Sequence, residues 1–491
     1  MITAAEVRER AREWSLREHV VEKDYVLGWF LWAIATDRTL SASWVFKGGT
    51  CLKKCYFETY RFSEDLDFTA RNEESLDPDA LRRVFVAIGE RIYEASGIEV
   101  PRDLVRFEAY TTRRGRRAVE GRVSYRGPLQ PRGDLPRLKL DLTADEVLVQ
   151  DGVPRQVAHP FTDGLRDGAI VQCYSMAELF GEKIRALSER CLPRDLYDVV
   201  SIHRHPDLGL EPHEVYGVLQ RKCAHKGLAV PTLDAVSRLV ATGELAGEWE
   251  NMLRHQLPDL PPFDAFLVEL EDLFAWLTPP AAAPQPLEAV PAPPRPTQRR
   301  PPLAPMLMPP ASIDVGWSAP ATIGSWGASS PVERIRFAAA NRLCVDLGYD
   351  GTVRRIEPYG LKRTTAGDLL ISAVRHDSGA PRYYRVDRIQ SVQVSTQVFQ
   401  PRFPIELWGV GGSGARQMSS AMGFTTPRRP RRSSRGYGAL TRVGGPRYVV
   451  QCSYCGKQSR RSNTRLAKHK MKGNPSFDCP GRAGFIVRSL P

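Results

Sequence analysis

Phe46-Lys47-Gly48-Gly49-Thr50 opens the most informative part of this chain, and Arg61-Phe62-Ser63-Glu64-Asp65-Leu66-Asp67-Phe68 completes it a short helix later. A glycine pair lets backbone N–H groups approach a phosphate, because no side chain blocks the way. Asp65 and Asp67 alternate with apolar residues, so a strand would place both carboxylates on one face. Two hard oxygen ligands on one face suit Mg²⁺. A phosphate cradle joined to a metal-binding pair is the minimum that transfer of a nucleotidyl group requires.

Each motif alone also has an ordinary interpretation. A Gly-Gly-Thr sequence is usually a turn, and an Asp-x-Asp sequence is usually a solvated strand face. Their order here is strand, glycine loop, short helix and acidic strand, and this order favours the catalytic interpretation.

A third carboxylate stands in a later strand, Arg137-Leu138-Lys139-Leu140-Asp141-Leu142-Thr143. The three leucines alternate with polar residues, so Asp141 is expected on the face opposite the leucines. If the two acidic strands are neighbours, Asp141 lies beside Asp65 and Asp67. The alternative is an edge-strand carboxylate that faces solvent.

The helix after Tyr174 contains an unusual lysine. Ser175 and Glu178 form a capping-box pattern, which predicts that the helix begins here. Lys183 lies in the apolar stripe of this helix, and a buried ammonium group needs a partner because its desolvation is costly. A triphosphate or a pair of carboxylates would supply one, whereas a lysine that reaches the rim would need none.

The next helix brings two aspartates three residues apart, Asp195 and Asp198. Asp195 stands near the helix start, where a carboxylate stabilises the helix dipole. Asp198 has no such explanation, which makes it a candidate functional residue.

The chain as a whole has 491 residues, enough for about three domains. No run of about 18 apolar residues exists, so neither a transmembrane helix nor a membrane partner is predicted. Nine cysteines, an odd number, indicate a reducing compartment and therefore a cytoplasmic protein.

The positive charge is concentrated at the C-terminal end. From Arg428 onward there are sixteen Lys and Arg residues and one acidic residue, Asp478, so this segment carries +15 while the whole chain carries +13. Such a segment would bind nucleic acid through its phosphates. The alternative is a basic tail that only aids solubility.

Composition and periodicity divide the chain into five parts: residues 1–277 as an α+β domain, 278–330 as a Pro/Ala-rich linker, 331–408 as a β-rich domain, 409–446 as a Gly/Ser/Arg-rich flexible segment, and 447–491 as a small cysteine-bearing module. In the first part we expect helices around Val20–Leu27, over Leu81–Ala95 and from Ser175 onward to a last helix, Phe263–Leu277. The expected strands are Trp44–Lys47, Phe62–Thr69, Val105–Thr111, Arg122–Tyr125 and Leu138–Leu142.

Residues 15–205 resemble the AbiEii/AbiGii family of nucleotidyltransferase-like toxins, which belong to the polymerase β-type superfamily. The likeness rests, in chain order, on the two opening motifs, Lys139-x-Asp141-x-Thr143, Glu182-Lys183-x-Arg185-Ala186-Leu187 and Pro193-Arg194-Asp195-x-Tyr197-Asp198. It implies a polymerase β-type core followed by a helical part.

The resemblance also implies roles for individual residues. Asp65 and Asp67 would hold Mg²⁺ or Mn²⁺, and Lys183 and Asp198 would correspond to the lysine and aspartate that the family needs for toxicity; with Asp141 these form the expected catalytic set. The expected contacts to the nucleoside triphosphate (NTP) are Lys47, Gly48, Gly49, Thr50 and Ser63. The implied reaction moves an NMP group from an NTP to a nucleic-acid hydroxyl. In the family the acceptor is a tRNA 3′ end, and GTP binding is also known, so the resemblance leaves both open for this chain. A cognate antitoxin and a role in toxin–antitoxin or phage-defence systems follow from the same likeness.

Residues 331–408 look like a WYL domain, expected as a small SH3-like β-barrel. The segments that carry this likeness are Ile356–Arg363, Gly367–Ile371 and Tyr383–Ile389. Arg363, Tyr384, Arg385 and Arg388 are candidate nucleic-acid contacts, because guanidinium groups pair with phosphate and tyrosine stacks on bases. The alternative is an inert barrel with Tyr359 and Tyr384 in its core.

The last module contains a CxxC…H…C set: Cys452, Cys455, His469 and Cys479. Thiolates two residues apart, an imidazole and a distant thiolate suit tetrahedral structural Zn²⁺. So small a segment is expected to need the metal to fold, and its many basic residues again indicate nucleic acid as partner.

Three functions therefore compete. The favoured one is a metal-dependent nucleotidyltransferase toxin that acts on RNA. The second is a non-catalytic nucleic-acid-binding regulator that uses the WYL-like and zinc modules. The third is a kinase- or ligase-like use of the same metal site.

Overall fold

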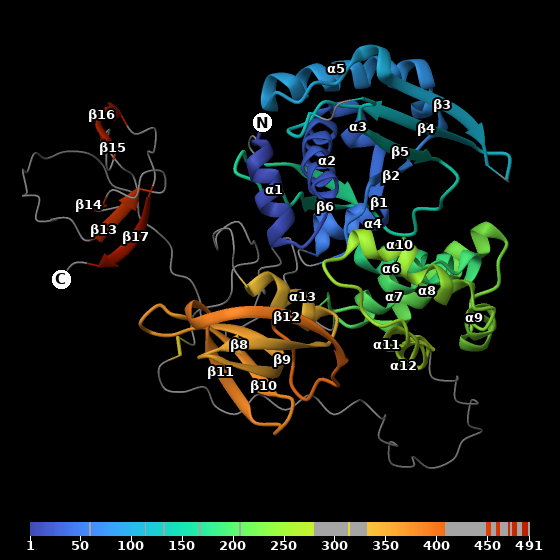
Figure 1. The fold of residues 1–491 in the computed structure, drawn as a ribbon. Helices are drawn as coiled ribbons and strands as arrows, with labels where there is room; N and C mark the ends of the chain where they lie inside the picture. Colours follow the sequence, from blue (N-terminus) through green and yellow to red (C-terminus); the bar gives the residue numbers. More distant parts are fainter. Residues whose placement is uncertain are drawn as a thin grey trace, which may run out of the picture. The chain divides into compact units, whose positions relative to one another are not determined.

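The computed structural model describes residues 1–57, 60–112, 114–130, 133–165, 168–205, 208–278, 313–314 and 331–407, together with five strand segments between residues 448 and 489. The chain separates into two compact units, Met1–Ala415 and Arg416–Pro491. Figure 1 shows the ribbon, coloured along the sequence.

A seven-stranded mixed sheet forms the centre of the N-terminal domain. Its strands are β1 (Trp44–Lys47), β2 (Asp65–Ala70), β3 (Val105–Thr111), β4 (Arg117–Ser124), β5 (Arg137–Thr143), β6 (Val153–Gln156) and β7 (Ile170–Cys173), in the order β3-β4-β5-β2-β1-β7-β6. The pairs β2–β5 and β1–β7 are parallel, and the other neighbours are antiparallel. The first acidic strand, β2, therefore lies in the middle of the sheet.

The helices before and beside this sheet are α1 (Ala4–Glu13), α2 (Glu18–Thr36), α3 (Arg38–Ser43), α4 (Gly48–Cys51) and α5 (Pro78–Ser96), and a π-helical turn (Leu52–Tyr56) continues α4. The ends of α5 follow local chemistry. The carboxylate of Asp77 accepts the amide N–H of Ala80, Pro78 occupies the first turn, and Gly97 ends the helix with a positive φ of 81°. Phe85 of α5 packs against Phe107 of β3, with ring centroids 4.9 Å apart.

A helical part follows the sheet. It contains α6 (Met176–Arg190), α7 (Pro193–His203), α8 (Pro212–Lys226), α9 (Leu233–Val240), α10 (Glu244–Leu253), α11 (Asp264–Leu267) and α12 (Glu269–Leu277). Helix α6 begins where the capping pattern predicts, because Ser175 Oγ accepts the amide N–H of Glu178. The Glu178 side chain does not return to the cap. It accepts the backbone N–H groups of Val149 and Gln150 instead, so only half of the predicted capping box forms.

Residues 331–407 form a helix and a five-stranded antiparallel sheet. The elements are α13 (Val332–Ala340), β8 (Leu343–Tyr349), β9 (Thr352–Arg363), β10 (Leu369–Arg375), β11 (Pro381–Arg385) and β12 (Ile389–Val398), and the strand order is β11-β10-β9-β8-β12. The β-rich character agrees with the prediction for this part, while closure into an SH3-like barrel stays a prediction.

The C-terminal unit contains β13 (Tyr448–Cys452), β14 (Gln458–Arg461), β15 (Lys470–Met471), β16 (Asn474–Asp478) and β17 (Gly484–Ser489). Strand β13 pairs with both β14 and β17, and β15 pairs with β16. Of the predicted zinc ligands, Cys452 ends β13, and Cys455, His469 and Cys479 lie outside the described residues. The zinc site therefore stays a prediction.

None of the helices in the described part of the chain combines the length and apolar character that a bilayer-spanning segment needs.

Candidate active site

The glycine loop turns sharply at the end of β1. Gly48 has a φ of +80°, a conformation that L-residues with a side chain rarely adopt. A Cβ atom at Gly48 would collide with the Asp67 carboxylate on the neighbouring strand. The register explains this closeness, because Lys47 pairs with Asp67 across β1 and β2. Backbone and carboxylate thus meet at a point that only glycine fits.

Gly49 packs against the second half of the motif. A Cβ atom there would lie 2.6 Å from Arg61 Nη2 and 3.0 Å from Ser63 Oγ. Thr50 makes a structural contact that the sequence did not predict. Its buried hydroxyl donates a 2.5 Å hydrogen bond to the backbone carbonyl of Asp65. Ser63 is only half-buried, so it is the better placed of the two hydroxyls to meet a triphosphate.

The three predicted carboxylates lie on one face of the sheet. Along β2, Asp65 and Asp67 are half-buried and alternate with the buried Leu66 and Phe68. Strand β5 is the parallel neighbour of β2, and its register places Asp141 directly beside Asp67. Because register partners point to the same side of a sheet, Asp141 does not face solvent from an edge strand.

Like charges crowd this face. Burial, aided by the carboxylates of Asp141 and Asp65, raises the pKa of Asp67 to about 6 against the opposing charge of Lys47. Burial also raises the pKa of Asp65. A carboxylate held near other carboxylates is destabilised in its charged form, and a bound cation removes this cost.

Asp141 has a partner that the sequence analysis did not assign. Lys139 Nζ lies 2.9 Å from Asp141 Oδ2 and 3.2 Å from Glu120 Oε2 of β4. Glu120 is the register partner of Asp141. One lysine thus bridges two acidic residues at the outer side of the site.

Asp198 is the centre of a separate, fully buried cluster. Its carboxylate accepts Arg61 Nε at 2.6 Å, Arg61 Nη2 at 2.7 Å and the Tyr60 hydroxyl at 2.7 Å. Lys183 Nζ lies 2.7 Å from the same carboxylate, so the predicted need of Lys183 for a partner is met by a carboxylate. Burial opposes ionisation of Asp198, but Arg61 and Lys183 outweigh it and lower its pKa.

This cluster touches the glycine loop through Arg61, whose guanidinium also donates to Gln256 Oε1 at 2.9 Å. Asp198 therefore positions Arg61 and Lys183, and Lys183 is near enough to act on the charge of Asp67. The sequence motif contains Arg61 and Glu182, but no role was predicted for either.

Glu182 anchors the other side of the loop. Lys47 Nζ lies 3.4 Å from Glu182 Oε1, and Lys222 of α8 lies 3.5 Å from Glu182 Oε2. Lys222 Nζ also stands 4.3 Å from the ring centroid of Tyr174. The only sequence signal for Glu182 was its position next to Lys183 in the same helix. Its partners in β1 and α8 are far from it along the chain.

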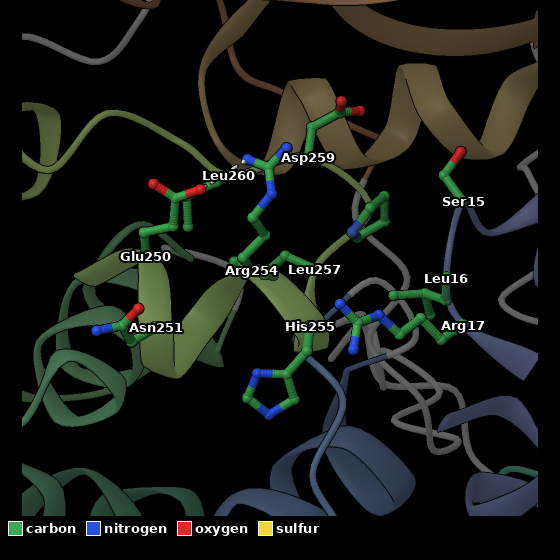
Figure 2. A pocket seen from close by; sticks show the side chains of 11 residues that line it. Ser15, Leu16, Arg17, Glu250, Asn251, Arg254, His255, Leu257, Asp259 and Leu260 are labelled. Atoms are coloured by element: carbon green, nitrogen blue, oxygen red, sulfur yellow. Dashed lines mark ion pairs between the residues drawn. The ribbon is translucent and has the colours of Figure 1, made fainter. Parts of the chain in front are cut away.

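A hollow of about 700 Å³ lies between the α1–α2 junction and the end of α10 (Figure 2). It is lined by Ser15, Leu16, Arg17, Glu250, Asn251, Arg254, His255, Leu257, Pro258, Asp259 and Leu260. His255 Nε2 lies 3.9 Å from Glu64 Oε1, so the hollow borders the acidic motif.

The candidate contacts of the WYL-like sheet are mostly occupied within the protein. Tyr384 is buried and packs edge-on against Tyr349, with centroids 5.1 Å apart, so its predicted stacking on bases does not agree with the structure. Arg385 pairs with Asp368 at 2.9 Å, and Arg363 pairs with Asp314 at 2.6 Å. Arg388 is exposed. Tyr359 is buried too, as the alternative interpretation expected.

The donor set fits a divalent metal ion. Asp65 and Asp67 offer hard oxygen atoms, and because burial raises the pKa of both groups, a bound cation would stabilise their charged forms. Mg²⁺ commonly takes one or two carboxylates and completes its shell with water and substrate phosphate. Lys47 and the glycine loop lie beside this pair, where a phosphate would be held.

Comparisons with known proteins agree with this geometry. Residues 29–269 match the family described as the nucleotidyl transferase AbiEii toxin of type IV toxin–antitoxin systems, and residues 332–394 match the WYL domain. These matches support a nucleotidyltransferase toxin domain followed by a WYL domain.

Among solved structures, the chain matches MenT4, a nucleotidyltransferase toxin from Mycobacterium tuberculosis, at 20% identity and a TM-score of 0.36, covering 57% of this chain and 91% of that one. JHP933 from Helicobacter pylori has 17% identity and a TM-score of 0.35, with 53% and 93% covered. Comparison with curated proteins gave no match.

Proposed function

We propose that residues 1–277 transfer an NMP group from an NTP to a hydroxyl of a nucleic acid, with RNA, including tRNA 3′ ends, as the acceptor. The chain would act as the toxin of a toxin–antitoxin or phage-defence system. The observation that carries this proposal is the meeting of the glycine loop with Asp65, Asp67 and Asp141 on one sheet face. The family match at residues 29–269 supports it.

In this proposal the triphosphate lies over the glycine loop. The loop backbone, Lys47 and Ser63 bind its oxygen atoms, and Gly48 and Gly49 allow the close approach. Asp65 and Asp67 would hold Mg²⁺ or Mn²⁺, which when bound neutralises triphosphate charge and stabilises the developing negative charge. Lys183, held by Asp198, adds positive charge near Asp67.

The acceptor hydroxyl attacks the α-phosphorus in line with the leaving group. A new P–O bond forms, the bond to the β-phosphate oxygen breaks, and pyrophosphate leaves. Asp141, the register partner of Asp67, would take the proton of the attacking hydroxyl, while Lys139 holds its second oxygen.

The partner predictions belong to the same proposal. The basic C-terminal segment and the predicted zinc ligands Cys452, Cys455, His469 and Cys479 would recruit the nucleic acid. A cognate antitoxin is the expected protein partner, in line with the type IV toxin–antitoxin description of the matching family.

The test is incubation of the full chain with each labelled NTP, Mg²⁺ and total RNA. We expect labelled RNA from the unsubstituted protein and none from Asp65→Ala/Asp67→Ala. The matched control is Glu108→Gln, which changes an exposed carboxylate on β3 of the same sheet, two strands from Asp141. RNA labelling that survives the double substitution would overturn the proposal. RNA binding without any labelling would favour the non-catalytic regulator, which the concentration of positive charge after Arg428 also supports.

A further inference from the structure

Three cysteines gather directly behind the glycine loop. Cys51 ends α4, Cys55 lies one turn further in the π-helical turn, and Cys173 ends β7. Their sulfur atoms all lie within 4.8 Å of one another, and all three side chains are buried. In the described part of the chain, no other group of three His, Cys, Asp or Glu residues offers ligand atoms so close together.

The local fold explains why these thiols meet. Cys51 and Cys55 are four residues apart on one helical segment, so they share a face. Cys173 is the register partner of Phe46 in the parallel pair β1–β7, which places it beside the strand that leads into the loop. Among the described residues, Cys223 and Cys344 are buried without two thiol neighbours, as is usual for a core cysteine.

The guanidinium group of Arg155 lies beside the thiols, and not all of its N–H groups have a hydrogen-bond partner among the described residues. Arg155 of β6 acts on the charge of Cys51 and Cys55, and its guanidinium carbon lies 4.6 Å from the ring centroid of Tyr56. Its Nε is buried and has no hydrogen-bond partner among the described residues. Three thiolates, one divalent cation and one guanidinium sum to zero charge, which is what a buried site requires.

We propose that Cys51, Cys55 and Cys173 bind a thiophilic divalent metal ion of the Zn²⁺ class. In a tetrahedral zinc site with Zn–S bonds of about 2.3 Å, sulfur atoms stand about 3.8 Å apart, so the observed cluster needs to contract by only about 1 Å. Three thiolates fill three of the four positions of such a site. Binding releases the thiol protons, because the ligands are thiolates.

The site has a structural consequence for the glycine loop. A metal ion on these sulfur atoms would tie the segment that follows Thr50 to β7. Thr50 bonds the backbone of Asp65, so the ion would help to hold the loop against the acidic strand. This inference is independent of the transferase proposal, because it concerns a structural ion and not the reaction.

The test uses the full chain with Cys452→Ser/Cys455→Ser, which removes the predicted C-terminal zinc site. We expect about one zinc ion per chain by mass spectrometry of the purified protein. Adding Cys55→Ser should abolish the bound zinc, whereas adding Cys223→Ser, a matched buried cysteine outside the cluster, should not. Zinc retained by the Cys55→Ser chain would overturn the proposal.

A second measurement does not depend on how the Cys55 variant folds. A mercurial reagent is titrated into the Cys452→Ser/Cys455→Ser chain, and released zinc is followed with a chromogenic chelator. Release of about one zinc ion as the buried thiols react would support the site. A folded chain that releases no zinc, even after refolding with added Zn²⁺, would overturn it.

Discussion

The same domain shifts the pKa values of two sets of carboxylates in opposite directions: those of Asp65 and Asp67 on the sheet face are raised, and that of Asp198 is lowered. On the sheet face, Asp65 and Asp67 lie near Asp141, and burial with mutual repulsion raises the pKa of Asp67. Asp198 receives Arg61, Lys183 and Tyr60 at 2.6 to 2.7 Å, and its pKa falls. Lys47 and Lys139 only partly offset the three carboxylates of the first group, whereas the carboxylate of Asp198 is fully paired. A group with excess negative charge suits a cation and substrate, whereas a fully paired one suits the positioning of other residues.

The largest expected effect is on the sheet face. Asp65→Asn/Asp67→Asn should lower NTP-dependent RNA labelling at least about 1000-fold, because metal stabilisation of the transition state is worth several kcal/mol. The thermal midpoint of the unsubstituted chain should rise with added Mg²⁺, and that of the double variant should not. An equal Mg²⁺ response in both proteins would contradict the assignment of these ligands.

Substitution of Asp198 should affect stability most. Asp198→Asn leaves Arg61 and Lys183 buried without their anion, so we expect the free energy of unfolding to fall by about 3–5 kcal/mol in urea titration at pH 7. Because the pKa of Asp198 is lowered, its contribution is present above the ordinary aspartate pKa and is lost as the pH falls through the lower native value.

Two variants make the comparison between the clusters sharper. Asp67→Asn removes a repelled charge and should leave the metal-free chain equally or more stable at pH 7. Asp103→Asn, on an exposed residue, should change little. If Asp67→Asn and Asp198→Asn destabilise the chain equally, the contrast between the two clusters is wrong.

The glycine loop should show an intermediate effect. Gly48→Ala places a Cβ atom against Asp67 and forces alanine to a φ of +80°, so we expect about a 100-fold loss of labelling, the scale of a 1 Å misplacement in an active site. The control is Gly217→Ala, which lies within α8 and has open space around it. Comparable losses in both variants would show that the close approach to Asp67 is unimportant.

The smallest effect separates two hydroxyls. Thr50→Val leaves the Asp65 carbonyl without its donor and should cost about 1 kcal/mol of stability, with little change in the KM for NTP. Ser63→Ala should do the reverse, raising the KM several-fold at unchanged stability. Both variants are measured by urea titration and by steady-state labelling. A KM change seen only in Thr50→Val would indicate that Thr50, and not Ser63, contacts the triphosphate.

The parts of the fold that sequence predicted are those set by local periodicity. Strands β1 and β3 begin and end at the predicted residues, and Ser175 caps α6 as expected. The face shared by Asp65 and Asp67 follows from alternation alone. The position of Asp141 beside Asp67 depends on β2 and β5 being neighbours in the sheet. The sequence does not reveal which strands are neighbours, so this position could be predicted only conditionally.

The residues that sequence missed are those whose roles depend on distant contacts. Arg61 and Asp198 are 137 positions apart, and Lys47 and Glu182 are 135 apart. Nothing in the local pattern of either residue indicates its partner. The contact between the Thr50 hydroxyl and the backbone of Asp65 was missed for the same reason, since the two residues belong to separate elements of the chain. The contact of Thr50 with the triphosphate stays a prediction.

The close approach of Gly48 to Asp67 has a genetic consequence. Every amino acid other than glycine brings a Cβ atom, so we expect every replacement of Gly48 to disturb the loop and lower activity. If the chain is toxic when expressed, survivors of that expression should carry missense changes at codon 48 in many chemical varieties, small and large alike. A position such as Thr50, where serine keeps the hydroxyl, should yield a narrower spectrum. The spread of escape alleles along the gene would thus reveal, without any biochemistry, where backbone and carboxylate meet.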